Sequence, residues 1–457
     1  MNAKPNSLAA RDIEYLMHPQ TNLKLHREVG PNLVDHGGGV WITDGNGERL
    51  LDAMSGLWCA SLGYASERLA QVAYEQMRKL SFGHLYRHNS HEPAIELAEK
   101  LLEIAPPSMS KVHFQNSGSE ANDVAIKLVW YYHNAIGKPE KRKIISRKGA
   151  YHGSSVATVS LTGKLDMHEG FNLPLDGFLH TDCAYFFREG QKNESEEEYA
   201  TRLAENLDAL IEQEGPETVA AFFAEPVLGS AGAISPPKTY FEKIQSVLKK
   251  HEVLFVVDEV ITGFGRTGNM WGSDTFALKP DMMTAAKALS AAALPISAVM
   301  ISERVYEVLV SHSERLGNYA HGHTYAGHPA SAAVALEVQK IYEEMDIASV
   351  ARRLGGVLNE TLMEFADHPM VGEIDVTGLM AGMELVADKQ NRTPYSADQR
   401  VPAMVEEAAR KNGLIIKSIG SRIAFAPAYV MSEEELGELG ARLGKALDQT
   451  YAEIGAS

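Results

Sequence analysis

From about residue 67 onward, short apolar runs alternate with longer amphipathic segments. The amphipathic segments have the length and periodicity of helices, as in residues 120–136 and 196–213. The apolar runs have the length of strands, and they span residues 111–118, 141–149, 220–227, 253–260 and 295–302. Strands that alternate with helices are typical of a parallel sheet, and continuous apolar strands indicate that both of its faces are covered. The predicted fold class is therefore α/β with a mostly parallel sheet.

The two ends of the chain follow other patterns. Residues 33–52 predict two short strands around the turn sequence DGNG. Beyond residue 330 the pattern predicts an α+β unit with a helix at 330–345, a strand at 378–387, a helix at 400–411, strands at 413–418 and 422–428, and a last helix that starts at Ser432 with a Ser432–Glu435 capping box. We expect an N-terminal segment (1–66) that packs with the small domain, a large domain (67–330) and a small C-terminal domain (331–457).

Composition narrows the class of protein. The net charge of −17 argues against a nucleic-acid partner, because such a partner needs a basic face. Cys59 and Cys183 give neither a disulfide framework nor a metal-ligand spacing, and they fit a reducing cytoplasm. Residues 1–20 lack the apolar core of a signal peptide. The run 282–302 comes closest to the length of a membrane span, but Thr, Ser, Pro and Lys interrupt it. We therefore expect a cytoplasmic protein with no membrane partner.

The run 282–302 contains a single charged residue, Lys287. A buried and unpaired ammonium group costs several kcal/mol, so its place among small apolar residues needs an explanation. Three explanations are open: the side chain reaches water from a helix end, it binds a phosphate, or it is condensed with an aldehyde and carries no ammonium.

Two other segments place polar groups at the ends of predicted strands. In residues 114–127 a strand ends in Asn-Ser-Gly-Ser and a helix follows, so Gly118, Ser119 and the free amides of the helix suit an anion. A simple helix cap is the alternative. Asp258 lies at the carboxyl end of an apolar strand, where ligands of α/β sheets bind. Residues 263–268 have the glycine spacing of a dinucleotide-binding loop, but no helical pattern follows, so we reject that interpretation.

A phosphate cradle, an acid at a strand end and a lysine isolated in an apolar run are the three groups that pyridoxal phosphate (PLP) needs. Condensation of its aldehyde with Lys287 removes the cost of a buried ammonium. A carboxylate partner such as Asp258 keeps the pyridine nitrogen protonated, so that the ring withdraws electrons.

The chain resembles the class III PLP-dependent aminotransferases of fold type I. Within this family it is similar to the omega-amino acid:pyruvate and amine:pyruvate transaminases. The resemblance covers roughly residues 15–450 and rests on the motifs NSGSEAN, GAYHG, FFAEPV, DEVITGFGRTG, AAKALS and HGHTYAGHP, which occur in that order. It implies a large domain around a mostly parallel sheet of seven strands, and a homodimer with shared active sites. It also implies ping-pong transfer of an amino group from an amine or omega-amino acid to a keto acid, with pyruvate as the expected acceptor.

The resemblance implies a role for each matched residue. Lys287 would carry the cofactor and move protons, and Asp258 would pair with the ring nitrogen. The other implied contacts are Gly118 and Ser119 to the phosphate, Tyr151 and Val260 to the two ring faces, Glu225 to the hydroxyl side of the ring, and Thr324 to the phosphate of the neighbouring subunit. Without the family, Tyr151 and Val260 are ordinary core residues, and Glu225 is a structural ion-pair partner.

The segment around Thr324 allows one alternative. His321, His323 and His328 suggest a metal site, but no carboxylate or cysteine accompanies them at a tight ligand spacing. We therefore predict no metal.

The resemblance also implies a substrate pocket. Trp58 and Tyr86 occupy positions that line the site in similar enzymes, although both suit a plain core. Ser230 stands where relatives often have a small residue. Relatives carry a carboxylate-binding arginine where this chain has Lys417, and an arginine follows at Arg422. A lysine is a point charge and cannot form the bidentate fork. We expect Arg422 or Lys417 to bind the keto-acid carboxylate, and the alternative is that Arg422 is a solvated surface residue and Lys417 alone binds the carboxylate.

Two rival functions remain on the same sequence features. The same cofactor and fold support a decarboxylase, a racemase or an aminomutase. A non-catalytic PLP-binding protein is a less suitable interpretation, because this chain contains both Lys287 and Asp258.

Overall fold

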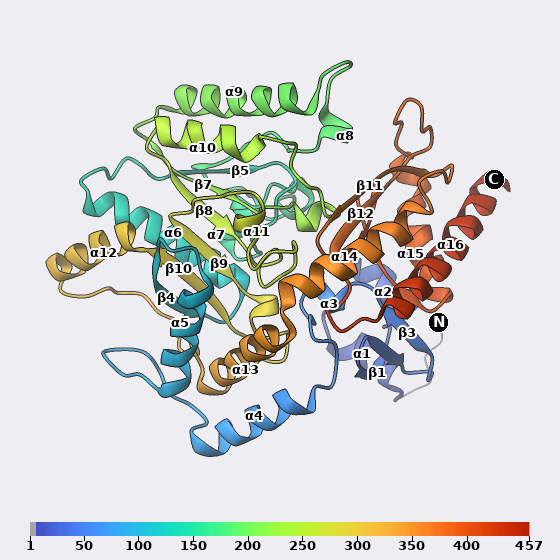
Figure 1. Cartoon of the computed structure of the whole chain (residues 1–457), viewed down its shortest axis with the longest axis horizontal. Coiled ribbons are helices and arrows are strands. Elements are labelled where there is room, and N and C mark those ends of the chain that lie inside the picture. Colours follow the sequence, from blue (N-terminus) through green and yellow to red (C-terminus); the bar gives the residue numbers. More distant parts are fainter. Residues whose placement is uncertain (1–5, 457) are drawn as a thin grey trace.

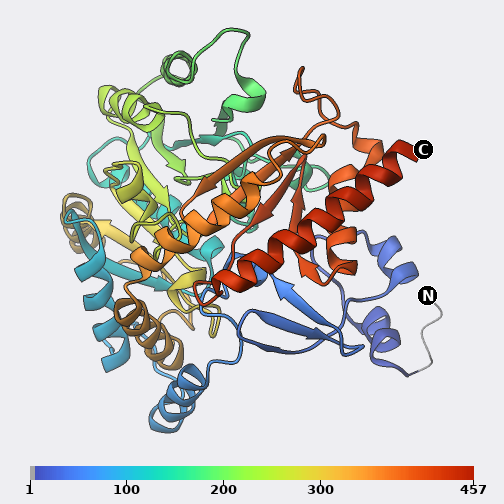
Figure 2. The same cartoon turned by 45° about the vertical axis from the view of Figure 1, so that its right-hand side comes forward.

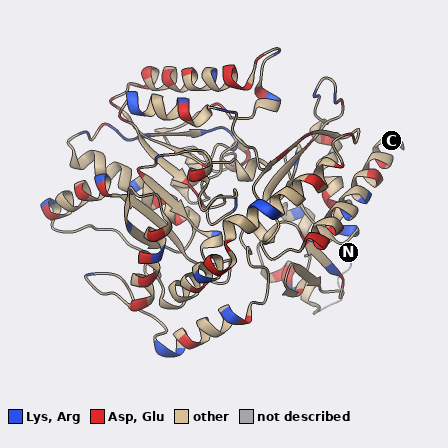
Figure 3. Cartoon of the chain, in the orientation of Figure 1, with Lys and Arg blue, Asp and Glu red and all other residues tan. Residues whose placement is uncertain are grey.

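The computed structural model describes residues 6–456. Residues 1–5 and 457, at the outer ends of the predicted N-terminal segment and C-terminal domain, lie outside the described residues. Among the described residues, no helix combines the length and the apolar character needed to cross a membrane. Acidic and basic residues share the outer helices, while the central strands carry few charges (Figure 3).

A sheet of seven strands forms the centre of the molecule (Figure 1). Its strands, in spatial order, are β4 (Met109–Gln115), β10 (Ser297–Ser302), β9 (Met282–Ala285), β8 (Leu254–Asp258), β7 (Val219–Ala224), β5 (Lys143–Arg147) and β6 (Phe178–Thr181). The two pairings of β10, with β4 and with β9, are antiparallel, and the other pairings of this sheet are parallel. The predicted mostly parallel sheet is confirmed. The sequence pattern had not separated β9 from the apolar run that contains it, and it had not identified β6.

Helices cover both faces of this sheet, as the continuous apolar strands predict. Neighbouring residues of one strand belong to different clusters of the core, because successive side chains of a strand point to opposite faces. In β7, Phe222 packs with one cluster and Phe223 with the other, and both are fully buried. One face is covered by α6 (Gly118–Ala135), α7 (Val156–Leu161) and α12 (Glu303–Leu316). The other is covered by α5 (Glu92–Ile104), α9 (Glu196–Glu214), α10 (Tyr240–Lys250) and α13 (Pro329–Met345).

The remaining helices are short or lie at the edges of this body. They are α4 (Glu67–Lys79), α8 (Phe186–Glu189), α11 (Gly272–Thr275) and the one-turn 3-10 helices η1 (Leu165–Met167), η2 (Gly229–Ala231) and η3 (Lys287–Leu289). No helix opens directly from the glycine loop 263–268, because turns continue from it to the four-residue α11. The rejection of a dinucleotide-binding loop is therefore confirmed.

The N-terminal segment contains one strand more than its pattern predicts. It consists of α1 (Leu8–Tyr15), α2 (Leu23–Val29), β1 (Val34–Gly38), β2 (Trp41–Asp44), β3 (Arg49–Asp52) and α3 (Ser55–Trp58). The two strands predicted around DGNG are confirmed as β2 and β3, but the pattern missed β1, which is separate because Gly39 adopts a positive φ of 55° and turns the chain back on itself. The turn DGNG joins β2 to β3, as predicted.

The C-terminal residues form a separate sheet, in which all strand pairings are antiparallel, with three helices beside it. Its strands, in spatial order, are β11 (Val371–Thr377), β12 (Met380–Leu385), β15 (Arg422–Phe425) and β14 (Lys417–Ile419). The helices are α14 (Ile347–Met363), α15 (Val401–Lys411) and α16 (Glu433–Ala456), and η4 (Ala397–Gln399) precedes α15. The predicted capping box is confirmed, since the Ser432 hydroxyl and amide both donate to Glu435, whose own amide donates to Ser432.

The prediction of a single strand at residues 413–418 is wrong. Its first part, β13 (Leu414–Ile415), pairs in parallel with β3, whereas β14 pairs with β15 in the other sheet. The N-terminal strands therefore lie beside the C-terminal helices and strands (Figure 2).

Candidate active site

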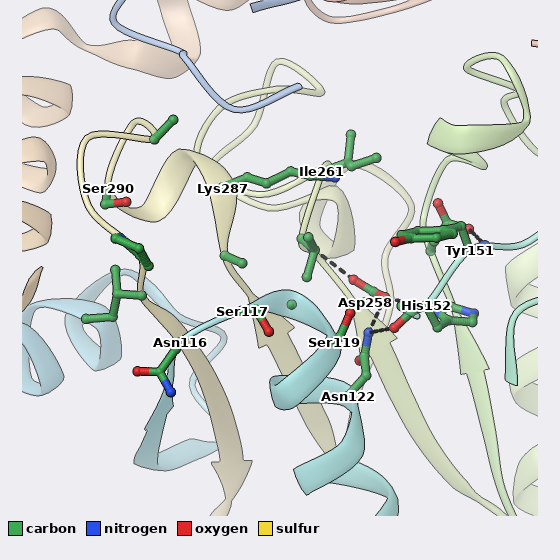
Figure 4. Close-up of a pocket in the computed structure, with 18 of the residues that line it drawn as sticks. Asn116, Ser117, Ser119, Asn122, Tyr151, His152, Asp258, Ile261, Lys287 and Ser290 are labelled. Carbon is green, nitrogen blue, oxygen red and sulfur yellow. Dashed lines mark hydrogen bonds and ion pairs between the residues drawn. The ribbon is translucent and has the colours of Figure 1, made fainter. Parts of the chain in front are cut away.

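A cavity of about 330 Å³ opens at the carboxyl ends of the parallel strands (Figure 4). Ligands of open α/β sheets bind at this edge, because strand ends and helix starts meet there. The cavity is lined by seven of the eight residues that the sequence assigns to the cofactor: Gly118, Ser119, Tyr151, Glu225, Asp258, Val260 and Lys287. Thr324, the eighth, does not line it.

Lys287 follows β9 and begins the 3-10 turn η3 with a φ of +47°. A left-handed backbone in a residue other than glycine is unfavourable by about 1 kcal/mol or more, and such residues cluster at functional sites. Among the described residues, Nζ has no partner within hydrogen-bonding distance. Burial lowers the pKa of Lys287, and the charge of Asp258 acts in the opposite direction. The side chain therefore lines the cavity without an ion-pair partner among the described residues of this chain.

Asp258 ends β8, and protein donors surround its carboxylate. Oδ2 lies 2.8 Å from His152 Nδ1 and accepts a 2.7 Å hydrogen bond from Asn122 Nδ2, while Oδ1 accepts one of 3.0 Å from the Val260 amide. Burial alone would raise the pKa of Asp258. The hydrogen bonds from His152, Val260 and Asn122 outweigh burial, so the pKa is lowered. The carboxylate is therefore ionised at neutral pH and faces the cavity that Lys287 lines.

Asn122 and His152 are the site residues that the sequence-based prediction missed. Both lie within motifs that carry the family resemblance, but their contact with Asp258 joins segments far apart in the chain. Asn122 also donates to the His152 carbonyl and accepts from Thr284, so three elements hold the acid in place. His152 Nε2 is buried and has no hydrogen-bond partner among the described residues.

The start of α6 presents the residues of the predicted anion site in one turn. The cap of this helix is Ser117, whose hydroxyl accepts from the Glu120 amide, so Gly118 and Ser119 occupy the first turn. The helix cap is therefore Ser117, and it leaves Gly118 and Ser119 available to an anion. A Cβ on Gly118 would lie 3.1 Å from Val260 Cγ1, closer than most such contacts, which explains the need for a small residue. The Ser119 hydroxyl accepts a 3.1 Å hydrogen bond from the Ser154 amide and keeps its own proton to donate.

Glu225 is anchored by backbone amides. Oε1 accepts from the Tyr151 amide at 3.0 Å, and Oε2 accepts from the Gly229 amide at 3.1 Å. The structural ion pair considered from the sequence is absent among the described residues. Burial raises the pKa of Glu225, and the carboxyl group faces the cavity beside Tyr151.

Together, these residues fit PLP. The first turn of α6 offers amide and hydroxyl donors to a phosphate, Asp258 offers an ionised acceptor to a pyridinium N–H, and Lys287 offers an amine without a protein partner. Gly118 leaves the cavity free of a side chain at the position where Val260 approaches it.

The predicted substrate residues lie in three places. Trp58 is 6% exposed and packs in one apolar cluster with Ile261, which lines the cavity. Ser230 belongs to η2, and its hydroxyl is buried without a partner among the described residues. Tyr86 lies elsewhere: with His321 and His323 it lines a separate surface hollow, and Gly322 packs against its ring. Within one chain, Tyr86 and the loop that contains Thr324 therefore lie outside the cavity.

Lys417 and Arg422 also lie outside the cavity lining. The Lys417 side chain is half exposed, and its Nζ lies 3.3 Å from a carboxylate oxygen of Glu406. Arg422 is 1% exposed, so the prediction of a solvated surface residue is wrong. Its guanidinium donates to the Gly232 carbonyl, the Tyr185 hydroxyl and, at 2.8 Å, the Glu373 carboxylate.

We expect Arg422→Leu to destabilise the fold and to affect both half-reactions equally. The variant removes a buried guanidinium that pairs with Glu373 at 2.8 Å and donates to the Gly232 carbonyl and the Tyr185 hydroxyl, and the loss of hydrogen bonds to a charged group costs about 1.5–3 kcal/mol. Urea denaturation measures the loss. The control is Arg353→Leu, because its pair with Glu433 is exposed and contributes about 0–1 kcal/mol. If Arg422→Leu were stable and lost only its reaction with keto acids, Arg422 would have to bind the substrate carboxylate.

Comparisons with known proteins match most of the chain to aminotransferases. The family model described as "Aminotransferase class-III" matches residues 25–447. A protein named gamma aminobutyrate transaminase 2 from Solanum lycopersicum is 47% identical over 428 residues, with 93% of each chain covered. A vanillin aminotransferase from Capsicum frutescens is 46% identical over 428 residues, again with 93% of each covered. The crystal structure of an omega transaminase from Pseudomonas jessenii in complex with PMP superposes with a TM-score of 0.97 at 47% identity, over 98% of this chain and 99% of that one.

Proposed function

The chain belongs to the class-III aminotransferase family of PLP-dependent enzymes, and we propose that it moves the amino group of a primary amine or omega-amino acid to pyruvate. The observation that carries this proposal is the pair of groups in the cavity: an amine, Lys287 Nζ, with no protein partner among the described residues, and an ionised Asp258 fixed by three donors.

The side chains of the cavity divide the work of transamination. PLP supplies the aldehyde carbon that takes up the amino group and the ring that withdraws electrons. Lys287 Nζ would take the proton from the substrate carbon and deliver it to the cofactor carbon that receives the amino group, and burial favours its neutral, basic form. Asp258 would hold a proton on the pyridine nitrogen by its negative charge. Gly118 and Ser119 would hold the phosphate, Tyr151 and Val260 would contact the ring, and Glu225 fixes the Tyr151 loop.

The donor class is supported by the cavity and by the relatives. Apolar side chains, among them Val260, Ile261 and Leu294, form much of the cavity lining, which suits the hydrocarbon part of an amine. The relatives are named for gamma aminobutyrate, vanillin and omega transamination. In gamma aminobutyrate, and in omega-amino acids generally, the amino group is not on the carbon next to the carboxylate. Vanillin is an aldehyde, the carbonyl counterpart of a primary amine.

The decisive experiment measures alanine formed from pyruvate with a panel of amines and omega-amino acids. We expect alanine and the ketone or aldehyde product in equal amounts, because each turnover moves one amino group. Carbon dioxide release or racemisation without alanine would instead indicate a decarboxylase or a racemase on the same fold, and conversion of the donor to an isomeric amine would indicate an aminomutase.

We further propose a homodimer in which each site takes Thr324 and Tyr86 from the other subunit. Both residues border a face with exposed aromatic side chains: Tyr325 is 64% exposed and Phe82 41%, and their rings are 5.9 Å apart. Exposed apolar patches of this kind mark interfaces. The cavity within one chain lacks Thr324, which is consistent with a site completed by a partner.

Mixed dimers of Lys287→Ala and Thr324→Ala test the sharing of sites. Thr324→Ala alone should retain PLP less well, because the phosphate loses a hydroxyl donor. Random mixing places one intact site in each hybrid dimer, so we expect about a quarter of wild-type activity at limiting PLP. Activity no higher than that of the two variants measured apart would show that the sites are not shared.

The predicted location and domain limits also stay as proposals. We propose that the enzyme acts in the cytoplasm, where Cys59 and Cys183, both free in the structure, stay reduced. We propose residues 67–330 as the PLP-binding domain, with 331–457 and the N-terminal segment 1–66 as the smaller unit.

A further inference from the structure

Asp12, His18 and His26 form a compact polar group in the N-terminal segment, away from the PLP cavity. Each residue comes from a different part of the segment: Asp12 lies in α1, His18 in the connector that follows, and His26 in α2. His18 Nε2 lies 3.0 Å from both carboxylate oxygens of Asp12, and His26 Nε2 lies 3.0 Å from Oδ1. The ligand atoms of these three side chains all lie within 4.8 Å of one another.

The chemistry and the spacing of this group fit one metal ion. A zinc ion binds imidazole nitrogen and carboxylate oxygen at about 2.0–2.2 Å, so neighbouring ligand atoms around it lie roughly 3 Å apart. Both histidines present the same ring atom, Nε2, to the same carboxylate oxygen, and their ring centroids are 4.3 Å apart. Two imidazoles and a carboxylate, with water in the remaining position, are a ligand set that zinc accepts.

Hydrogen bonding alone is the alternative explanation of these contacts. It requires a proton on each Nε2, donated to Asp12. The single N–H of His18 would then lie at equal distance from two oxygens, one of which already accepts from His26. A hydrogen bond favours an angle above about 150° at its proton, so one N–H cannot be well aligned with both oxygens. A shared ion needs no such alignment, because each ligand atom offers it a lone pair.

A second group of three such side chains shows what a filled site looks like. Asp208, Glu212 and His251 also bring their ligand atoms together. There, Lys250 Nζ lies 2.8 Å from each carboxylate oxygen of Asp208, so a cation of the protein already neutralises the acid. In the described part of the chain, no lysine or arginine forms an ion pair with Asp12. With both imidazoles neutral, the group therefore keeps one negative charge that attracts a cation.

The group is shielded from water and still open on one side. The side chains of Asp12 and His26 are 13% and 11% exposed, whereas that of His18 is 29% exposed. An ion bound there would be held by largely buried ligands and would enter past His18. Ligand identity, spacing and an entry path are the properties by which a metal site is judged.

The surrounding helices have little else to hold them in place. α1 has eight residues and α2 has seven, and neither contains a buried residue. Helices of this length are not stable by themselves in water. Both lie at one edge of the molecule, beside the N-terminal strands (Figure 2). Small units without a core are often stabilised by a metal ion, and one bound here would join α1, the connector and α2.

We propose that Asp12, His18 and His26 bind a divalent transition-metal ion of the zinc class, and that this ion fixes α1 to α2. Water fills the remaining position, and the role is structural. This site is independent of the transamination reaction. It replaces the prediction of no metal, which considered the histidines of residues 321–328 and not this group.

The first test measures zinc binding to the full-length holoenzyme. Bound metal is removed with a chelator and free PLP by gel filtration, and zinc is then titrated in competition with a chromophoric chelator. Asp12→Asn, and His18→Gln combined with His26→Gln, should weaken the binding of one zinc ion per chain by at least about a hundredfold. Even the loss of a group that only supports a metal ligand costs about tenfold to hundredfold.

The variants and the control separate metal binding from hydrogen bonding. Glutamine keeps an amide donor for Asp12, so the double variant retains hydrogen bonds while it loses both imidazoles. Both variants should keep the visible absorption of bound PLP, which reports an intact fold. The matched control is His251→Gln, because Lys250 already occupies that group, and this variant should bind zinc as the wild type does.

Limited proteolysis tests the structural role. The connector between α1 and α2, residues 16–22, consists mostly of exposed residues. Zinc at about a hundred times its Kd should slow cleavage there up to about a hundredfold, because cleavage needs an opened segment that does not bind the ion. A chelator should reverse the effect, and neither variant should show it.

Equal zinc binding in the wild type and in both variants would overturn the site. Wild-type binding only at millimolar zinc would mean an adventitious ion only, with the same conclusion. Zinc binding that both variants lose, without any effect of zinc on cleavage of the connector in the wild type, would support the site and overturn its structural role.

Discussion

Lys287→Ala is expected to abolish nearly all transamination and to remove the visible absorption of PLP bound covalently to the protein. The residue combines the two properties that the task needs: a half-buried amine without a polar partner among the described residues, and a strained backbone that directs it into the cavity. An alanine at this position has neither a nucleophile nor a base. Losses of this kind reach many orders of magnitude, since each factor of ten corresponds to about 1.4 kcal/mol of barrier.

Reductive trapping locates the lysine directly. Borohydride treatment of the holoenzyme followed by peptide mapping should place the pyridoxyl label on Lys287. The matched control is Lys148→Ala, because Lys148 is exposed and pairs with Asp182, and this variant should keep both activity and absorption. A label on any other lysine of the wild-type protein would refute the assignment.

Asp258→Asn should bind PLP and lose catalysis by several orders of magnitude. An asparagine has nearly the same shape, so it can keep part of the contacts to Asn122, His152 and the Val260 amide. It has no negative charge, and a pyridine nitrogen opposite it gives up its proton, which makes the ring a poor acceptor of electrons. The lowered pKa of Asp258 implies that the wild-type charge persists throughout the neutral and mildly acidic range.

The measurement is kcat with the holoenzyme of each variant, after PLP content has been determined. Asp281→Asn is a suitable control, because Asp281 precedes β9 at the opposite end of the strands and pairs with Arg304. If Asp258→Asn kept more than about a tenth of the wild-type kcat, a barrier change below ~1.4 kcal/mol, the proposed role of the charge would be wrong.

The sequence was most informative where one residue type contradicts its surroundings. Lys287 in an apolar run and Asp258 at a strand end are both unfavourable without a ligand, and both line the cavity. His152 and Asn122 gave no such signal, because a histidine and an asparagine after a strand or in a helix are ordinary. Their contact with Asp258 depends on the order of the strands in the sheet, which no local pattern contains.

Arg422 shows the opposite failure. By residue type it was a free cation on a strand, available to a substrate, yet the structure buries it against Glu373 and near Glu384. Those acids belong to other strands, so their contact with Arg422 depends on the tertiary fold and not on the local sequence. The split of residues 413–418 between two sheets is similar: both parts are extended, and their partners, β3 and β15, place them in different sheets.

The reversed direction of β10 has a consequence for the evolution and engineering of this enzyme. Because β9 and β10 are adjacent and antiparallel, the chain from Lys287 to Ile296 is a hairpin loop with both ends tied to one register, in which Met283 lies opposite Met300. A slip of the lysine along the sheet would break both strands at once. Ala292, Leu294 and Pro295, in the outer part of that loop, also line the cavity. Changes in loop length or side-chain size there can therefore reshape the mouth for a new amine while the lysine keeps its place.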